Sequence, residues 1–504
     1  MGFNLVDDSF IDVLTKRGPE THSLIDLFNH LEDIIDLDLK PNAKVAVMRF
    51  LMAIVDATGL LEDSESIEMY CGDRSGFISG CIEYLEKHRD CFNLYGDRPF
   101  LQAPFLADSF TKKNIKTESL NMPIEFLHRI GKSTKALLDS DYVYDSIRPA
   151  DKEIALGLII QQCYSANYKA SAGDVISDAS GIPFVQTSGA TPDFIKKQSL
   201  MTFFVRGKNL LETLLYNTYT KEEIPEIFPQ NSKDVRPVWE LDNTSYKSME
   251  NSVDKFSYSN RLVSYTRLIK IPEQGSMMIY VGGPKYEDLP ENNTYYKRFA
   301  EKSTNKTWRK TYEKEGHMWR SLDVISPVSL NKPAGVLGYR ILDILKAMDS
   351  DYIDIEAFGA AVSNSSGLLY VSQWYNSSFR VKNPQEFFMS IGIRCKFRKA
   401  MNYSSAIENK LQKASEDYFN VLNITDSNVK REKLEILTNK YWDTLNNFKH
   451  YLEDSNTHNE WYKKVRYSAY SAFKCYDGVS FDVKKAYAIG FNVLKSKGLR
   501  NGSK

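Results

Sequence analysis

The chain has 504 residues and a formal net charge of zero, and 42% of its residues are hydrophobic and 26% charged. This composition is that of a soluble globular protein, and the zero net charge excludes a global attraction to nucleic acid or membranes. A single hydrophobic core stops growing well below this length, so we expect two or more domains.

The charges are unevenly distributed along the chain. Residues 1–40 hold nine acidic and three basic residues, whereas residues 461–504 hold ten basic and two acidic residues. The C-terminal excess predicts a basic surface. That surface is either a phosphate-binding face or an ordinary solvated helix face.

Sequence motifs for a metal, a disulfide framework or a membrane span are missing. The six cysteines form no C-x-x-C pair and have no regular spacing with histidine. The N-terminus is acidic where a signal peptide is basic, and no apolar run reaches eighteen residues. We therefore expect a reduced, cytoplasmic protein without a metal, a cofactor or a membrane partner.

The first half of the chain mixes strands and helices. Residues 3–13 indicate a short strand, a turn and a second strand. Residues 42–59 are apolar on nearly all sides and end in Gly59, which predicts a buried helix. A further helix is expected at 75–90.

An arginine-glycine pair then separates an apolar strand at 202–205 from an amphipathic helix. Gly207 is typical of a tight strand-to-helix turn, because glycine tolerates backbone angles that other residues avoid. In an alternative interpretation, Arg206 and the N-terminus of the helix face an anionic partner. The stretch itself favours the turn.

The middle of the chain alternates loops and hairpins. Residues 169–198 contain three glycines, two prolines and no base between the terminal lysines, which predicts a long functional loop. Residues 264–283 indicate a hairpin, followed by an exposed excursion at 284–316. Residues 352–374 indicate two strands joined by a small-residue loop at 359–367.

The C-terminal part is helical. Four consecutive segments have helical periodicity and short connections, namely 385–421, 428–454, 458–475 and 480–497. Such a set predicts a four-helix bundle. The expected fold class is α+β, with a large mixed α/β domain at 1–380 and the bundle at 381–504.

No catalytic centre is visible. The stretch GKST at 131–134 ends like a phosphate-binding loop, but Phe126 stands where that loop needs glycine. Two acidic clusters leave a metal-dependent nuclease or phosphoesterase open as an alternative. Their members are Asp139, Asp141, Asp145, Asp349, Asp351, Asp354 and Glu356.

Binding is the stronger interpretation of the remaining features. In the last helices, basic residues alternate with tyrosine and phenylalanine, a composition found where proteins contact phosphates. Core packing accounts for most of those rings, whereas the bases are candidates for contacts with phosphates. These candidates are Lys463, Lys464, Arg466, Lys474, Lys484 and Lys485.

An ordered set of motifs resembles a known family. The stretches FNLVDDSFIDV, YGDRPFLQ, TFFVRGKNLLETLLYN, RPVWE and the 359–367 loop precede the helical C-terminal part in that order. Together they resemble the CasA family, the large subunit of the type I-E CRISPR surveillance complex Cascade. The similarity extends over essentially the whole chain.

The resemblance implies a non-enzymatic, RNA-guided antiviral role. Family members recognise the protospacer-adjacent motif of double-stranded target DNA through the minor groove and help to open the duplex. Their partners are the crRNA-bearing backbone, handle-binding and small subunits and a helicase-nuclease that the bundle helps to recruit. Base pairing reads the target sequence, while the protein reads only the short motif.

The resemblance also implies site residues. The glycine-rich minor-groove loop falls on Gly189, with Gly181 as second choice, and the minor-groove lysine on Lys285. The strand-separating wedge maps onto Ser363, Asn364, Ser365 and Ser366, although the family's glutamine is missing here. The loop that anchors the subunit in the complex maps onto 137–148, with Asp141, Tyr142 and Tyr144 as candidates.

For Arg206, the resemblance places the turn in the structural core beneath the motif-reading loops. We therefore expect this arginine to order the junction rather than to contact DNA. Two alternatives to motif recognition remain: the metal-dependent enzyme and a purely structural adaptor.

Overall fold

The structure is a computed structural model. It describes residues 2–111, 117–119, 148–165, 194–195, 198–199, 201–227, 236–252, 257–265, 267–283, 298–300, 307–309, 318–321, 340–365, 368–453 and 457–495. The chain divides into two compact units. The first comprises Met1–Lys314, Val336–Ser350 and Ile355–Ser377, and the second comprises Glu315–Gly335, Asp351–Asp354 and Ser378–Lys504.

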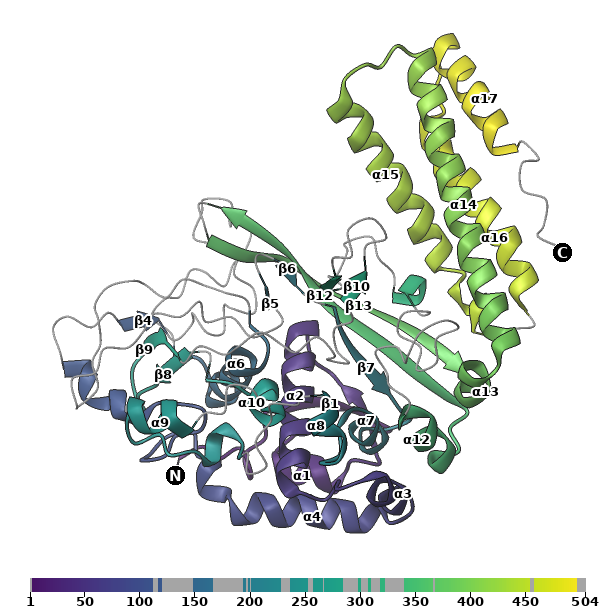
Figure 1. Ribbon diagram of the computed structural model, residues 1–504. Helices are drawn as coiled ribbons and strands as arrows, with labels where there is room; N and C mark the ends of the chain where they lie inside the picture. Colours follow the sequence, from purple (N-terminus) through teal and green to yellow (C-terminus); the bar gives the residue numbers. More distant parts are fainter. Residues whose placement is uncertain are drawn as a thin grey trace. The chain divides into compact units, whose positions relative to one another are not determined.

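Helix α2, Pro41–Thr58, forms the centre of the first unit (Figure 1). Fourteen of its residues are buried, from Asn42 to Val55, as its all-round apolar sequence predicts. It ends at Gly59, whose φ of 72° is the left-handed conformation that a glycine C-cap adopts. The predicted helix at 42–59 is thus confirmed.

Other helices of the first unit pack around α2. Those in contact with it are α4 (Arg74–Lys87), α6 (Asp151–Cys163), α7 (Leu210–Asn217) and α10 (Tyr258–Leu262). Further helices of this unit are α1 (Leu24–Asn29), α3 (Ser64–Gly72), α8 (Glu223–Ile227), α9 (Tyr246–Ser252) and α12 (Arg340–Met348).

Several small antiparallel sheets complete the first unit. Strands β1 (Ile11–Thr15), β2 (Gly18–His22) and β3 (Ile34–Leu37) form one sheet in the order β2-β1-β3. A second has β4 (Thr117–Ser119), β9 (Met277–Gly282) and β8 (Arg267–Lys270), so the predicted hairpin at 264–283 is confirmed. Two short pairs are β5 (Phe194–Ile195) with β6 (Gln198–Ser199), and β10 (Arg298–Ala300) with β11 (Thr307–Arg309).

A long hairpin differs from its prediction. Strand β12 extends over Tyr352–Ser365 and β13 over Leu368–Lys382, and β7 (Thr202–Arg206) joins them in the sheet order β13-β12-β7 (Figure 1). The expected loop at 359–367 is therefore wrong for residues 359–365, which are strand. Pairing with neighbouring strands outweighs the weak strand propensity of glycine, serine and asparagine.

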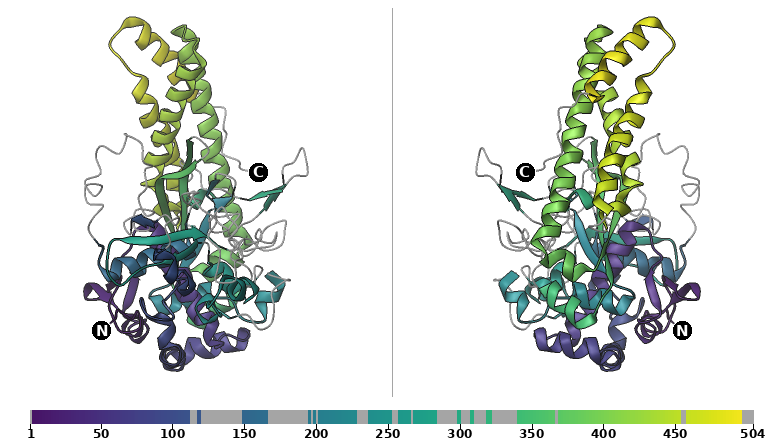
Figure 2. Two further views of the ribbon diagram at one scale, coloured as in Figure 1. Left: turned by 90° about the vertical axis from the view of Figure 1, so that its left-hand side faces the viewer. Right: turned by 90° about the vertical axis from the view of Figure 1, so that its right-hand side faces the viewer.

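The second unit contains the predicted bundle. Its long helices are α14 (Ile391–Val421), α15 (Ser427–Asn446), α16 (His458–Phe473) and α17 (Phe481–Lys495), preceded by the short α13 (Pro384–Met389). Helix α14 packs against the other three long helices. Figure 2 shows these green and yellow helices running side by side. The mixed fold with a helical C-terminal region is confirmed.

Three buried tryptophans pack at one end of the bundle. The ring of Trp319 lies 5.8 Å from that of Trp442 and 5.2 Å from that of Trp461. The indole of Trp319 donates to Asn446 Oδ1 at 2.9 Å, and Arg320 stacks 3.7 Å from the Trp442 ring. A stretch that precedes the bundle by about seventy residues thus completes its core.

Within the described ranges, no helix is long and apolar enough to cross a membrane.

Candidate nucleic-acid interface

Many of the residues that the sequence singles out cannot be located. Outside the described residues lie Gly181, Gly189, Lys285, Ser366, Asp141, Tyr142 and Tyr144, together with the GKST stretch and most of the 169–198 and 284–316 segments. Ser363, Asn364 and Ser365 form the end of strand β12. Residues 366 and 367, between the two strands of the hairpin, are outside the described residues.

Arg206 belongs to a network of four charges within the first unit. Its guanidinium lies 3.1 Å (Nε) from Glu356 Oε1 on β12 and 3.6 Å (Nη1) from Asp36 Oδ2 on β3. Lys44 Nζ, on α2, lies 2.7 Å from Asp36 Oδ1 and 2.8 Å from Glu356 Oε2. Two cations and two carboxylates therefore join one helix to three strands.

The network is largely removed from water. The side chains of Lys44 and Glu356 are each 10% exposed, so an unpaired charge here would be costly. Burial raises the pKa of the Glu356 carboxyl, and the charge of Lys44 opposes that shift. The arrangement connects three strands to α2 and leaves Arg206 directed at carboxylates.

The glycine after Arg206 is required by close packing. A Cβ on Gly207 would lie 2.4 Å from Glu212 Cβ and 2.8 Å from Glu212 Oε2. The Glu212 carboxylate accepts the Lys208 backbone N–H at 2.8 Å, and the N-cap Asn209 accepts the Glu212 N–H at 2.9 Å. The start of α7 is thus capped by its own side chains.

These contacts bear on the alternatives at this turn. Arg206 orders the junction as expected, because its guanidinium pairs with Asp36 and Glu356. This pairing favours the turn over an anion-facing site, and the expectation that Arg206 does not contact DNA stays a prediction. The local pattern of apolar strand, Arg-Gly pair and amphipathic helix correctly predicted a turn. The carboxylates that Arg206 contacts lie far from it in the sequence.

Two acids of the acidic cluster at 349–356, Asp354 and Glu356, are paired with cations. Arg380 binds Asp354 through two hydrogen bonds, Nε to Oδ1 at 2.9 Å and Nη2 to Oδ2 at 2.8 Å, and stacks 4.1 Å from the Tyr352 ring. Glu356 belongs to the four-charge network. In the described parts of the chain, no three histidine, cysteine, aspartate or glutamate residues are placed to share a metal ion.

The candidate DNA-backbone residues fall into two groups on the bundle. In the first group, each base already has a neighbour in the bundle. Lys463 Nζ lies 2.6 Å from Glu460 Oε1, Lys464 Nζ lies 4.8 Å from the Phe448 ring, and Arg466 donates to the Tyr403 hydroxyl. These three bases lie within about one turn of α16.

The second group lies where α16 passes into α17. Lys474, Lys484 and Lys485 are exposed, and none of them forms an ion pair with another described residue. Lys433 of α15 is an exposed base near the same end, since its backbone carbonyl accepts from the Tyr476 hydroxyl at 3.2 Å. We call these four residues the end lysines.

Sequence reasoning missed Lys433, because helix α15 is mixed in charge and gives no basic stripe. The electrostatic effect of this residue is visible at Cys475. Burial raises the pKa of that thiol, while the charges of Lys440 and Lys433 oppose the shift. The basic end of the bundle therefore draws on α15 as well as on the C-terminal helices.

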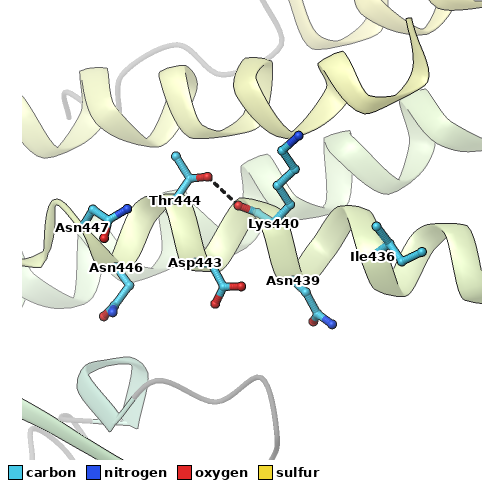
Figure 3. Close-up of a pocket in the computed structure, with 7 residues that line it drawn as sticks. All are labelled: Ile436, Asn439, Lys440, Asp443, Thr444, Asn446 and Asn447. Carbon is cyan, nitrogen blue, oxygen red and sulfur yellow. Dashed lines mark hydrogen bonds between the residues drawn. The ribbon is translucent and has the colours of Figure 1, made fainter.

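A hollow of about 650 Å³ lies along α15 (Figure 3). Its lining is mostly polar: Ile436, Asn439, Lys440, Asp443, Thr444, Asn446 and Asn447. In Figure 3, Asn439, Asp443 and Asn446 point to one side of the helix and Lys440 to the other. With one acid and one base, this hollow has no net charge to attract phosphates.

Comparisons with known proteins agree with this fold. Residues 4–472 match the family model described as CRISPR-associated protein Cse1. The CasA structure from Thermus thermophilus has a TM-score of 0.73 at 17% identity, covering 98% of this chain and 99% of that one. For Cse1 from Thermobifida fusca the TM-score is 0.72 at 17% identity, with 98% of both chains covered.

A third similar chain belongs to a CRISPR RNA-guided surveillance complex. Its TM-score is 0.67 at 16% identity, and 98% of this chain and 100% of that one are covered. At such identities the structural likeness shows the fold alone. No curated protein sequence gives a significant match.

Proposed function

The chain belongs to the CRISPR-associated Cse1 family, and we propose that it is the large, non-catalytic subunit of a type I-E Cascade surveillance complex. The observation that carries the proposal is the family match over residues 4–472, which covers nearly all of the first compact unit and most of the second. The similar fold of a chain from an RNA-guided surveillance complex supports it.

In this role the subunit recognises the protospacer-adjacent motif in double-stranded target DNA. The proposed minor-groove residues are Gly189 or Gly181, Lys285, and the hairpin residues Ser363, Asn364, Ser365 and Ser366. The structure supports Asn364 and Ser365 through their position, because they end a 14-residue strand. Paired strands hold such residues more rigidly than a free loop would.

Minor-groove recognition distinguishes A·T from G·C pairs but little else, so we expect tolerance of several motifs. The family's wedge glutamine is absent, and Asn364 or Ser365 separates the DNA strands by steric contact instead. The other proposed minor-groove residues, namely Gly181, Gly189, Lys285 and Ser366, lie outside the described residues.

The bundle supplies contacts to the DNA backbone. Lys474, Lys484 and Lys485 support this proposal best, because they are exposed and form no ion pair with the described residues. Lys463, Lys464 and Arg466 would first have to exchange their present neighbours for phosphate. Each lysine that binds a phosphate releases a counterion, so affinity falls as salt rises.

The proposed protein partners are the crRNA-bearing subunits and the helicase-nuclease. Asp141, Tyr142 and Tyr144 would anchor the chain to the crRNA-bearing subunits through protein contacts, since an acidic loop is poorly suited to RNA. The helicase-nuclease supplies the DNA degradation that this chain is proposed to lack.

The test is target binding by the complete complex with and without this chain. The duplexes differ only in the few base pairs beside the guide-matched stretch. Binding that requires both the chain and the correct flank supports motif recognition. Binding that requires the chain but ignores the flank reduces it to a structural adaptor.

No contact among the described residues favours the alternative function, a metal-dependent nuclease or phosphoesterase. Asp354 is held by Arg380, and Glu356 by Lys44 and Arg206, so both carboxylates already neutralise cations. DNA hydrolysis by the purified chain with magnesium or manganese, abolished by Asp354→Ala, would contradict the proposed role.

A further inference from the structure

Two large apolar side chains are exposed at the turn between α16 and α17. Val479 is 93% exposed and Phe481 is 79% exposed. The turn itself is well packed. A Cβ on Gly478 would lie 2.7 Å from Val483 Cγ1, and Ser480 Oγ accepts the Val483 N–H at 3.3 Å.

Phe481 differs from the other aromatic residues of α17. Tyr487 stacks on Phe491 at 5.5 Å with 14° between the rings, and on Phe473 at 5.4 Å. Phe481 contacts no other aromatic ring of the described residues, and it begins the helix with its ring in water. An exposed aromatic ring held on an ordered turn is a common feature of binding surfaces.

Positive charges flank this ring. Lys484 and Lys485 follow Phe481 by three and four residues, so they share its face of the helix. Lys474 directly follows the preceding helix α16, and Asp477 and Asp482 are the acids nearest in sequence. The same exposed face continues through Ala488 and Asn492 to Lys495, about 21 Å from Phe481 at 1.5 Å per residue.

We propose that Phe481 is a stacking platform for an unpaired base of single-stranded nucleic acid, whose phosphates Lys484 and Lys485 neutralise. Single-strand binding sites combine aromatic faces with a basic track in this way. A docking surface for a protein would present a broader apolar face than Val479 and Phe481 with lysines on one side. The inference rests on the proposed function, in which the bundle holds DNA.

The experiment uses the full-length chain and oligonucleotides that carry one 2-aminopurine. Fluorescence anisotropy measures affinity for the single strand and its duplex, and quenching of 2-aminopurine reports stacking. We expect Phe481→Ala to weaken single-strand binding about 5- to 100-fold and to abolish quenching. Duplex binding should change little.

Three further variants separate stacking from apolar contact and from misfolding. Phe481→Trp should retain affinity and quenching, whereas Phe481→Leu keeps an apolar side chain but should lose both. Ile391→Ala is the matched control, because Ile391 is 64% exposed at the start of α14, away from the end lysines. It should behave as the unchanged protein.

Each outcome decides a specific claim. Full binding by Phe481→Leu overturns stacking, as does the absence of single-strand binding by the unchanged chain. If Lys484→Ala with Lys485→Ala weakens binding while Phe481→Ala does not, stacking fails and the DNA-holding role survives. If the complete complex also ignores the duplex flank, the proposed function fails separately.

Discussion

Lys44 Nζ and Glu356 Oε2 lie 2.8 Å apart and join the central helix α2 to strand β12. The contact connects residues more than three hundred positions apart in the sequence. Because Lys44 also neutralises Asp36, its removal leaves Arg206 as the one remaining described cation for two carboxylates.

We therefore expect Lys44→Ala to lower the free energy of unfolding by about 2–4 kcal/mol, since it leaves a buried carboxylate incompletely neutralised. Urea unfolding followed by circular dichroism measures the change. Lys16→Ala is the control. The Lys16–Asp33 pair is 63% and 52% exposed, so its loss should cost less than about 1 kcal/mol. Equal effects of the two substitutions would contradict the role of the network.

The turn after Arg206 gives a second prediction. Gly207→Ala should destabilise the protein by about 1–3 kcal/mol, because the added methyl group would overlap Glu212 Cβ. Gly72→Ala, at the end of α3, is a suitable comparison because its added Cβ would have no described atom within 4 Å apart from its chain neighbours and the backbone of its own helix. Thermal unfolding of both variants checks the difference. A neutral Gly207→Ala would show that Glu212 moves aside readily.

The raised pKa of Asp56, in the last turn of α2, should make the stability of the protein depend on pH. Burial raises the pKa of this carboxyl from 3.8 to about 7, and the charge of Lys221 opposes the shift. The folded chain therefore binds more protons than the unfolded chain between these values. The contribution of Asp56 to stability should thus fall as the pH rises from about 4 to about 7, and then remain constant.

Asp56→Asn should remove this dependence, because asparagine has no proton to bind or release in this range. The measurement is the free energy of unfolding of both proteins at pH 5, 6, 7 and 8. Since both proteins share all other titrating groups, the difference between the two curves isolates Asp56. A difference that does not vary with pH would show that this carboxyl has its ordinary pKa in the folded chain.

The exposed bases at the end of the bundle predict a change in salt dependence. Replacing Lys474, Lys484 and Lys485 together by alanine should reduce the slope of log affinity against log salt for single-stranded DNA by roughly 2, at about 0.7 per lost phosphate contact. Anisotropy titrations between about 50 and 200 mM salt determine the slope. Lys463→Ala, which removes a base already paired with Glu460, should change it less.

Substitutions of the proposed motif-reading residues should weaken the discrimination between flanking motifs. In the complete complex, Lys285→Ala and Asn364→Ala should each reduce the preference for the correct flank by about 1–3 kcal/mol, the usual cost of one lost base-edge contact. Competition between duplexes that differ only in the flank gives this quantity. Unchanged preferences in both variants would remove these two residues from the proposed site.

Sequence periodicity predicted the elements whose signals are local. Helix α2 and the bundle helices have continuous apolar faces, and Gly59 marks the end of α2. These helices could therefore be predicted without knowledge of their tertiary contacts. The hairpin residues 359–365 were different, because pairing decides their conformation more than the intrinsic preferences of glycine, serine and asparagine.

Long-range contacts account for what the sequence did not predict. Neither the partners of Arg206 nor the packing of Trp319 into the bundle leaves a signal at the spacing of a helix or a strand. The basic character of the C-terminal helices was predicted. Which lysines have neighbours and which do not depends on side-chain positions that only the folded structure supplies. The motif-reading residues remain predictions.

The cluster of Trp319, Trp442 and Trp461 gives this protein an optical probe. These are three of its six tryptophans, and all three belong to the second compact unit. Because the rings lie 5.2–5.8 Å apart, their excited states should couple and give a near-ultraviolet dichroism signal that unfolding of this unit abolishes. Replacing Trp319 by phenylalanine should remove that coupling and so assign the signal to this cluster. Comparing the thermal melting of this signal with that of the far-ultraviolet helix signal then shows whether the two units melt together or in succession.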